Sequence, residues 1–177
     1  NYFGKKIVLM GEDKDNTIIN GSQNSSVVIF ESEENNNSIL DGFSIINGKN
    51  QYGGGIHLNN SNPIIRNINL YNNIAEGGGG AGLYCIDADP IIKYVNIFNN
   101  NSDDVGGGIY LKGNSKPICS NIAIFQNNSS GAGGGVFVRD QSEPHFNHST
   151  IILNQTDTWG GGIAGKYGVN IKITNSI

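Results

Sequence analysis

The sequence predicts an all-β fold, a parallel β-helix (solenoid) with about six coils of 26–27 residues. Three kinds of residue recur along the chain at one interval. The four prolines lie 27 residues apart, four asparagines repeat at the same interval, and the first apolar residues after the glycine runs recur at 27, 26, 27 and 27 residues. These sets are Pro63, Pro90, Pro117 and Pro144; Asn73, Asn100, Asn127 and Asn154; and Ile56, Leu83, Ile109, Val136 and Ile163. Such a period is typical of proteins in which each unit stacks on the next.

Each repeat contains short segments of alternating polarity, such as "IHL", "IIRNINLYN" and "NIAIF". Alternation with a period of two indicates strands, and the leucine- and alanine-rich units of helical solenoids are absent. Three short strands joined by turns would complete one coil, and coils would stack about 4.8 Å apart. The stretch "TIING" ending at Gly21 and the stretch "SIING" ending at Gly48 are also 27 residues apart. We therefore expect residues 1–177 to form a single β-helix domain.

Glycine and asparagine are predicted to form the corners of the coils. Runs of glycine precede the strands that begin near Ile56, Ile109 and Val136. Glycine adopts positive φ without steric cost, so it suits a chain that doubles back tightly. Asparagine after a strand tolerates the left-handed conformation, and asparagines in successive coils can form a hydrogen-bonded amide ladder.

Composition limits the classes of partner. The chain has 11 basic and 15 acidic residues, a net charge of −4, and this balance predicts no basic stripe and no nucleic-acid partner. No run of 18 apolar residues occurs, so we expect no membrane span. Because the chain begins without methionine and ends abruptly at "ITNSI", it is interpreted as a piece of a longer protein.

The repeats resemble the right-handed parallel β-helix units of the pectate-lyase-like superfamily, especially the GGGI and S-x-P-x-I units of large secreted bacterial proteins. The matching stretches are "GGGIHLNNSNPIIRNINLYNN", "GLYCIDADPIIKYVNIFNNN", "GGGIYLKGNSKPICSNIAIFQNN" and "GGGVFVRDQSEPHFNHSTIILN", so the resemblance is strong over about residues 53 to 163. The chain is also similar to the repeats of chlamydial polymorphic outer-membrane proteins, because Phe98 with Asn101 and Phe125 with Asn128 match their F-x-x-N motif. The resemblance implies right-handed coils and an extracellular or cell-surface location. It implies either an enzyme or an inert stalk, since this architecture hosts both.

Alternation along the strands predicts two rows of aromatic side chains on the outside of the solenoid. The first row follows the glycine runs, and the second follows the prolines. Their members are His57, Tyr84, Tyr110 and Phe137 in the first row, and Tyr71, Phe98 and Phe125 in the second, which Ile152 continues. Exposed aromatic rows can bind sugar rings or another protein, so these seven residues are the candidate ligand-binding residues. The alternative is that rings of adjacent coils stack on each other and only stabilise the sheets.

The sequence predicts no catalytic residues. A lyase or hydrolase on this scaffold needs clustered carboxylates with a nearby cation. The nearest candidates are the pair Asp87 and Asp89 and the pair Asp103 and Asp104, both interpreted as solvated turns because neither repeats in the next coil. The motifs of pectate lyases and polygalacturonases do not carry over to this chain.

We expect no cofactor and no metal site. His57 is distant in sequence from His145 and His148, and no fixed carboxylate completes a ligand set. The acidic stretch at residues 11–17, "GEDKDNT", could chelate Ca²⁺, but it lacks the spacing of an EF-hand loop and is interpreted as a hairpin-like turn.

Two further features receive structural interpretations. Cys85 and Cys119 are predicted to point inward as buried free thiols, and a disulfide would require their Cα atoms to lie closer than about 7 Å. The glycines at 77–80 are not followed by the lysine and hydroxyl residue of a phosphate-binding loop.

The function expected from the sequence is that of a non-catalytic extracellular or cell-surface module: an adhesin, a spacer or a fibre subunit. Its aromatic rows would contact a glycan or a protein, and its ends could associate with further copies because uncapped coils expose unpaired strands. The alternative is a polysaccharide lyase or glycoside hydrolase, or the carbohydrate-binding part of one. Ice binding ranks last, because the five threonines at 17, 150, 156, 158 and 174 form no flat ladder.

Overall fold

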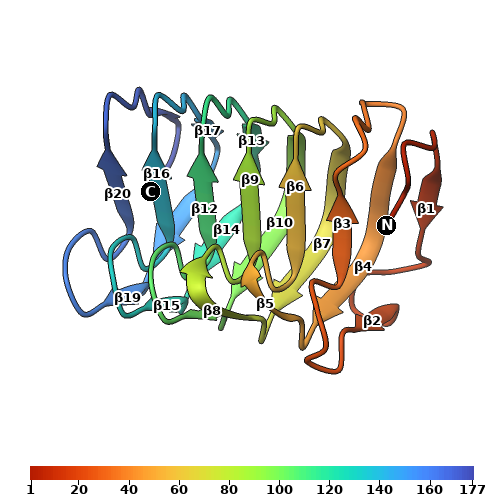
Figure 1. Cartoon of the computed structure of the whole chain (residues 1–177), viewed down its shortest axis with the longest axis horizontal. Coiled ribbons are helices and arrows are strands. Elements are labelled where there is room, and N and C mark those ends of the chain that lie inside the picture. The colour runs from red at the N-terminus through yellow and green to blue at the C-terminus, as the bar shows by residue number, and fades with distance from the viewer.

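The computed structural model describes residues 1–177 and contains strands but no helix, so nothing in it is a candidate membrane-spanning helix. Figure 1 shows strands stacked along one axis from the N-terminus to the C-terminus. Every strand pair is parallel. The predicted all-β parallel solenoid is therefore confirmed.

The strands form three sheets that make the walls of the solenoid. The ten-stranded sheet contains β1 (Val8–Met10), β2 (Ile18–Asn20), β4 (Ile39–Ile46), β7 (Ile64–Tyr71), β10 (Ile91–Phe98), β13 (Ile118–Ser120), β14 (Ala123–Phe125), β17 (His145–Asn147), β18 (Thr150–Ile152) and β21 (Lys172–Thr174). The six-stranded sheet contains β3 (Val28–Phe30), β6 (Ile56–Asn59), β9 (Leu83–Ile86), β12 (Ile109–Lys112), β16 (Val136–Arg139) and β20 (Ile163–Lys166). The five-stranded sheet contains β5 (Lys49–Tyr52), β8 (Ile74–Gly79), β11 (Asn101–Ser102), β15 (Asn128–Ser129) and β19 (Gln155–Thr156).

The strand register confirms the interval read from the prolines and from the residues after the glycine runs. In the ten-stranded sheet, the positions two residues after each proline pair directly, in the order Ile65, Ile92, Cys119 and Phe146. In the six-stranded sheet the paired positions are Ile56, Leu83, Ile109, Val136 and Ile163. These residues point into the tube, where aliphatic side chains of successive coils form one continuous core.

The first coil departs from the predicted register. Ile19 pairs with Ile45, an interval of 26 residues rather than 27. Ile45 is fully buried, so this pairing keeps both isoleucines on the same face, whereas a one-residue shift would turn Ile19 to the other face. The predicted hairpin-like turn is a turn but joins no hairpin, because β1 and β2 both run parallel to β4. Asp13 shapes it by accepting hydrogen bonds from Thr17 N at 2.8 Å and from Asp15 N at 3.0 Å.

The glycines at each corner have two different roles. The first of each run has positive φ, as the sequence predicts; Gly106 is an example at φ 61°. The third does not, and it is glycine because the next coil lies so close. A Cβ at Gly108 would be 2.6 Å from the carbonyl oxygen of Gly135. Conformational freedom therefore explains only part of each glycine run, and close stacking of the coils explains the rest.

The predicted amide ladder is present, and all its members except the half-buried Asn154 are buried. Asn73, Asn100, Asn127 and Asn154 each occupy the same place in successive coils, and the side-chain Nδ2 of each donates to Oδ1 of the next at 3.0, 2.9 and 2.9 Å. The left-handed conformation belongs to the residue before each of them, for example Asn99 at φ 53°. The two roles expected of one asparagine are thus divided between neighbours.

The two cysteines are free and buried, as predicted. Cys85 Sγ lies 3.2 Å from the carbonyl oxygen of Ala88. Burial raises the pKa of the Cys85 thiol to about 12 and also raises the pKa of Cys119. Both therefore act as apolar core residues, protonated and unreactive at neutral pH.

Glu34 ties the first turns of the chain together. Its carboxylate accepts hydrogen bonds from Gly4 N, Ser32 N and Ser61 Oγ, each at 2.9 Å. Burial alone would raise the pKa of Glu34, but these hydrogen bonds outweigh burial and lower it. Because the pKa is lowered in the folded state, Glu34 stabilises the fold at pH values above its ordinary pKa of 4.5. This stabilisation is lost as the pH falls through the lowered pKa.

We therefore expect Glu34→Gln to lower the free energy of unfolding at pH 7 by about 2 kcal/mol, because charge-assisted hydrogen bonds are replaced by weaker ones. The variant should also lose less stability than the original chain between pH 6 and 3. Urea unfolding followed by circular dichroism at both pH values measures this. Parallel loss of stability in the two chains on acidification would contradict the assignment.

Candidate ligand-binding groove

The first aromatic row points out from the six-stranded sheet, but it is buried rather than exposed. Tyr84, Tyr110 and Phe137 are only 3–4% accessible. Adjacent rings lie 5.3 Å and 5.5 Å apart. The row is covered by residues that precede the strands, among them Val105 and Ala132, which pack against it as a second apolar cluster. The expectation of an open aromatic face is corrected here: another part of each coil folds over it.

His57 lies at the amino-terminal end of this row. Its ring is 5.2 Å from the ring of Tyr84, and its Nδ1 is 3.1 Å from the carbonyl oxygen of Tyr52. The side chain is half-buried. One ring nitrogen is thus already engaged by the backbone.

The second row lies on the ten-stranded sheet and is stacked face to face. The rings of Tyr71 and Phe98 are 4.8 Å apart with an interplanar angle of 12°, and those of Phe98 and Phe125 are 5.0 Å apart at 4°. All three are half-buried. Their flat faces contact one another, which is the stacking arrangement that the sequence offered as the alternative to ligand contact.

A groove of about 310 Å³ opens along the covered row. It lies between strands β12, β16 and β20 and the segments that lead into them. Its lining residues are Tyr52, Asp104, Val105, Tyr110, Lys112, Gly131, Ala132, Phe137, Arg139, Thr158, Trp159 and Lys166. Two residues of the first predicted row, Tyr110 and Phe137, are among them, whereas the other five candidates are not. Trp159, with 47% of its surface exposed, is the open aromatic residue of the groove.

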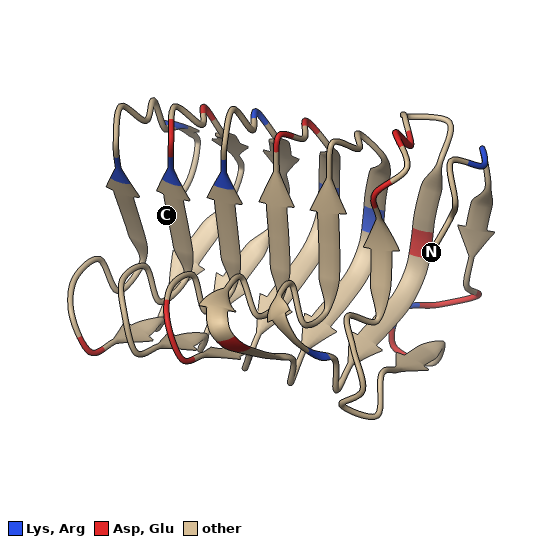
Figure 2. Cartoon of the chain, in the orientation of Figure 1, with Lys and Arg blue, Asp and Glu red and all other residues tan.

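Three cations form a row along this groove. Lys112, Arg139 and Lys166 are the last residues of β12, β16 and β20, and Arg139 pairs directly with Lys166. Figure 2 shows them as a blue band at the ends of three adjacent strands. The sequence contained the signal, since the three lie 27 residues apart, but the overall charge of −4 pointed away from any basic stripe. That expectation is corrected for this face of the molecule.

The cations differ in their surroundings. Arg139 Nε lies 2.9 Å from Asp140 Oδ2 but has no aligned hydrogen-bond partner. The Arg139 guanidinium carbon is 5.2 Å from the centre of the Tyr167 ring, and Lys166 Nζ is 4.7 Å from it. Lys112 and Lys166 form no ion pair. Cation–π contact with Tyr167 therefore helps to hold Arg139 and Lys166 in place. The ammonium groups of Lys112 and Lys166 keep hydrogen-bond donors available to a ligand.

Two other titratable groups of the groove lie near Arg139. Burial raises the pKa of Tyr110 above its ordinary value, and Arg139 opposes that shift. Burial also raises the pKa of Asp104, the neighbouring Asp103 adds to the shift, and Arg139 again opposes it. Asp104 is the only carboxylate that lines the groove.

The acidic pairs found in the sequence serve the turns. Asp87 accepts a hydrogen bond from Asn114 N at 3.0 Å, and Asp89 accepts one from Lys116 N at 2.7 Å, so each carboxylate holds a turn of the next coil. Asp103 accepts a hydrogen bond from the backbone in the preceding coil. Three or more histidine, cysteine or acidic side chains do not gather anywhere in a way that could hold a metal ion.

Comparison with protein-family models, curated proteins and solved structures finds no match to the chain. The fold and the groove together define a class: a parallel β-solenoid whose six-stranded sheet carries an aromatic groove edged by cations.

Proposed function

We propose that this chain is a non-catalytic extracellular or cell-surface module that binds a glycan in the groove beside β12, β16 and β20. The observation that carries the proposal is Trp159, an open indole in a groove that also offers polar groups. Its ring lies 6.0 Å from that of Phe137 at an interplanar angle of 71°, and 47% of its surface is exposed, so the indole offers apolar surface to a sugar ring. A pocket of about 310 Å³ is large enough for one or two sugar units.

The groove also explains why a non-catalytic role is favoured over the alternative of a glycoside hydrolase. Glycoside hydrolysis uses two carboxyl groups that face each other across the scissile bond. The lining contains one, Asp104. Its raised pKa is the feature that would suit a general acid. Release of new reducing ends or unsaturated products from a polysaccharide, lost in Asp104→Asn, would establish the enzyme instead.

Trp159 also supplies the test, because it is the only tryptophan in the chain. Titration with a binding glycan is expected to shift or quench its fluorescence. Trp159→Ala is expected to weaken binding at least about tenfold, measured by isothermal calorimetry, since one aromatic contact of this kind contributes about 1.5 kcal/mol.

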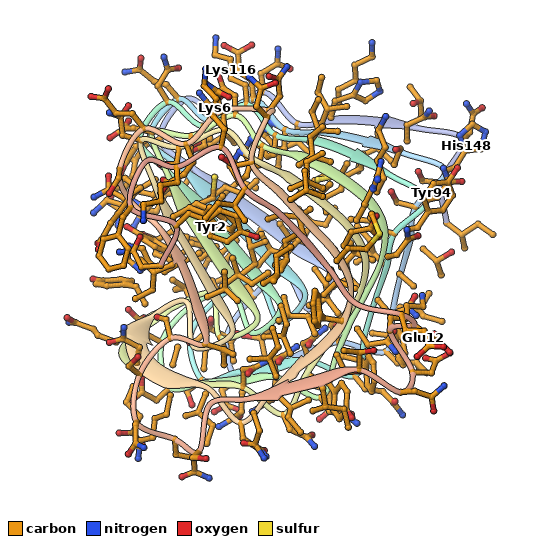
Figure 3. All side chains as sticks on the ribbon, turned by 90° about the vertical axis from the view of Figure 1, so that its right-hand side faces the viewer. Tyr2, Lys6, Glu12, Tyr94, Lys116 and His148 are labelled. Atoms are coloured by element: carbon orange, nitrogen blue, oxygen red, sulfur yellow. The ribbon has the colours of Figure 1, made fainter.

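A matched control is Tyr94→Ala. Tyr94 is a similarly exposed aromatic residue, 55% accessible, in β10 of the ten-stranded sheet. Figure 3 shows Tyr94 at the outer edge of the coils, whereas Tyr2 lies inside them. This variant should bind as the original chain does. Equal weakening by both substitutions, or none by either, would contradict a site at Trp159.

A further inference from the structure

We propose that the ligand of this groove is an acidic glycan that runs along the solenoid axis and places successive anionic groups on Lys112, Arg139 and Lys166. The inference rests on the proposed function and adds the charge and the direction of the bound chain. It follows from the position of the three cations in the fold, from the local charge and from the single open aromatic ring that lines the groove.

The position of the cations sets the direction of the ligand. Each comes from the same place in one of three successive coils, so the row runs parallel to the axis with a step of about 4.8 Å, the distance between neighbouring strands. The paired positions in the two preceding coils are Ile86 and Asn59, which carry no charge. The row therefore begins at Lys112.

The local charge opposes the charge of the whole molecule. Three cations and one carboxylate line the groove, a difference of +2 that Asp140, the ion-pair partner of Arg139, reduces to +1, while the chain as a whole carries −4. Several cations elsewhere are paired: Lys49 with Glu76, Arg66 with Asp41 and Lys116 with Glu143. In the groove only Arg139 is paired, with Asp140, and Lys112 and Lys166 form no ion pair. An excess of positive charge in a groove attracts anions and raises their local concentration.

The carboxylates beside the row limit its strength without cancelling it. Asp140 and Tyr110 both interact with the Arg139 guanidinium, so it has fewer free donors than the two lysines. Asp104 faces the same guanidinium across the groove and repels an anion there. Lys112 and Lys166 have no such neighbour within ion-pair distance. The two lysines are therefore expected to contribute most of the affinity.

A glycan fits better than a nucleic acid because of the aromatic residues. Single-stranded nucleic acids bind on several open rings on which successive bases stack. Of the rings that line this groove, Tyr110 and Phe137 are buried, Tyr52 is half-buried and Trp159 is open. The exposed ring of Tyr167 lies beside the groove in contact with Arg139 and Lys166. One ring together with a row of cations suits a chain with one sugar face and repeated carboxylate or sulfate groups.

The test compares four polymers with the complete chain: dextran sulfate, polygalacturonate, unsubstituted dextran and single-stranded DNA. Binding is followed by Trp159 fluorescence and by affinity electrophoresis. We expect dextran sulfate or polygalacturonate, or both, to bind, and unsubstituted dextran and DNA not to bind. Binding should persist in EDTA, because the protein's own cations make the contacts, and weaken as salt increases.

The decisive variant is the triple substitution Lys112→Gln, Arg139→Gln and Lys166→Gln, which should weaken binding of the acidic glycan about 100-fold or more. Its matched control removes the same charge at exposed positions outside the groove: Lys6→Gln, Lys93→Gln and Lys172→Gln. The control should change affinity less than about threefold, since charges this far away are screened. Thermal unfolding of both variants establishes that they are folded.

The outcomes separate this inference from the proposed function. Equal binding of an acidic glycan by the groove variant and its control would overturn the inference, and so would tighter binding of DNA or unsubstituted dextran. If unsubstituted dextran binds more tightly and Trp159→Ala abolishes its binding, the proposed function stands and only the inference about charge fails. Absence of binding to all four polymers would overturn the inference and leave the proposed function to be judged on other neutral glycans through the Trp159→Ala comparison.

Discussion

Replacing Asn127 by leucine is expected to lower the free energy of unfolding by about 4 kcal/mol, because the substitution leaves several buried polar groups unpaired. The Asn127 side chain accepts hydrogen bonds from Asn100 N at 3.1 Å and Asn100 Nδ2 at 2.9 Å. It donates to Ile97 O and to Asn154 Oδ1, both at 2.9 Å. Leucine matches the volume but supplies none of these bonds. Asn100 N and Ile97 O would each lose this bond in a buried site, and Asn100 Nδ2 would keep only its bond to Leu70 O.

Urea unfolding followed by circular dichroism measures the effect, with Trp159 fluorescence as a second probe because a solenoid can unfold in parts. The control is Asn101→Ala. Asn101 is exposed and its Oδ1 accepts only from Asn128 Nδ2, so its loss should change stability by less than about 0.5 kcal/mol. A stability of the Asn127 variant close to that of the control would mean that the buried ladder does not hold the coils together.

The contrast between Asn127 and the aromatic row shows which parts of the fold a sequence can reveal. Coils that stack must have nearly equal length, so the interval between prolines or ladder asparagines reads out the strand register directly. The interval differs from 27 near the amino terminus: Ile19 pairs with the buried Ile45 at 26 residues, and Leu40 pairs with Ile65 at 25.

The covering of the first row could not be read in this way. Alternation correctly placed Tyr84, Tyr110 and Phe137 outside the tube, since it follows from strand geometry. It says nothing about what lies above a strand. The residues that cover the row, such as Val105 and Ala132, belong to the corner before each strand, and their path across the sheet depends on how that corner folds.

The cation row could have been found in the sequence. Lys112, Arg139 and Lys166 share the 27-residue interval with the prolines, so an inspection of each repeat position for charge would have found them. Net charge averages over all faces, whereas a solenoid places each repeat position on one line of its surface. In a repeat protein, charge is therefore best examined position by position. Trp159 has no counterpart in the other repeats, so no interval could have indicated it.

The glycine runs show a comparable limit, and they allow a test within one chain. Gly135 and Gly162 occupy the same position in successive repeats, and neither has positive φ. A Cβ at Gly135 would lie 2.5 Å from Gly162 O and 2.8 Å from Asn154 Nδ2. At Gly162 the nearest atom is Ile151 Cγ2 at 3.8 Å, because no further coil stacks on it in this structure.

We therefore expect Gly135→Ala to destabilise the 177-residue chain by about 3 kcal/mol, since the added carbon forces two coils apart. Gly162→Ala should be neutral or stabilising by up to about 1 kcal/mol, because alanine reduces the freedom of the unfolded chain at a site that accommodates it. Thermal unfolding should show a melting temperature roughly 10 °C lower for the first variant and little changed for the second. Both substitutions alter the intrinsic backbone preference equally. Similar losses in the two variants would therefore assign the regular spacing of these glycines to local conformation, whereas a large difference assigns it to the close approach of the next coil.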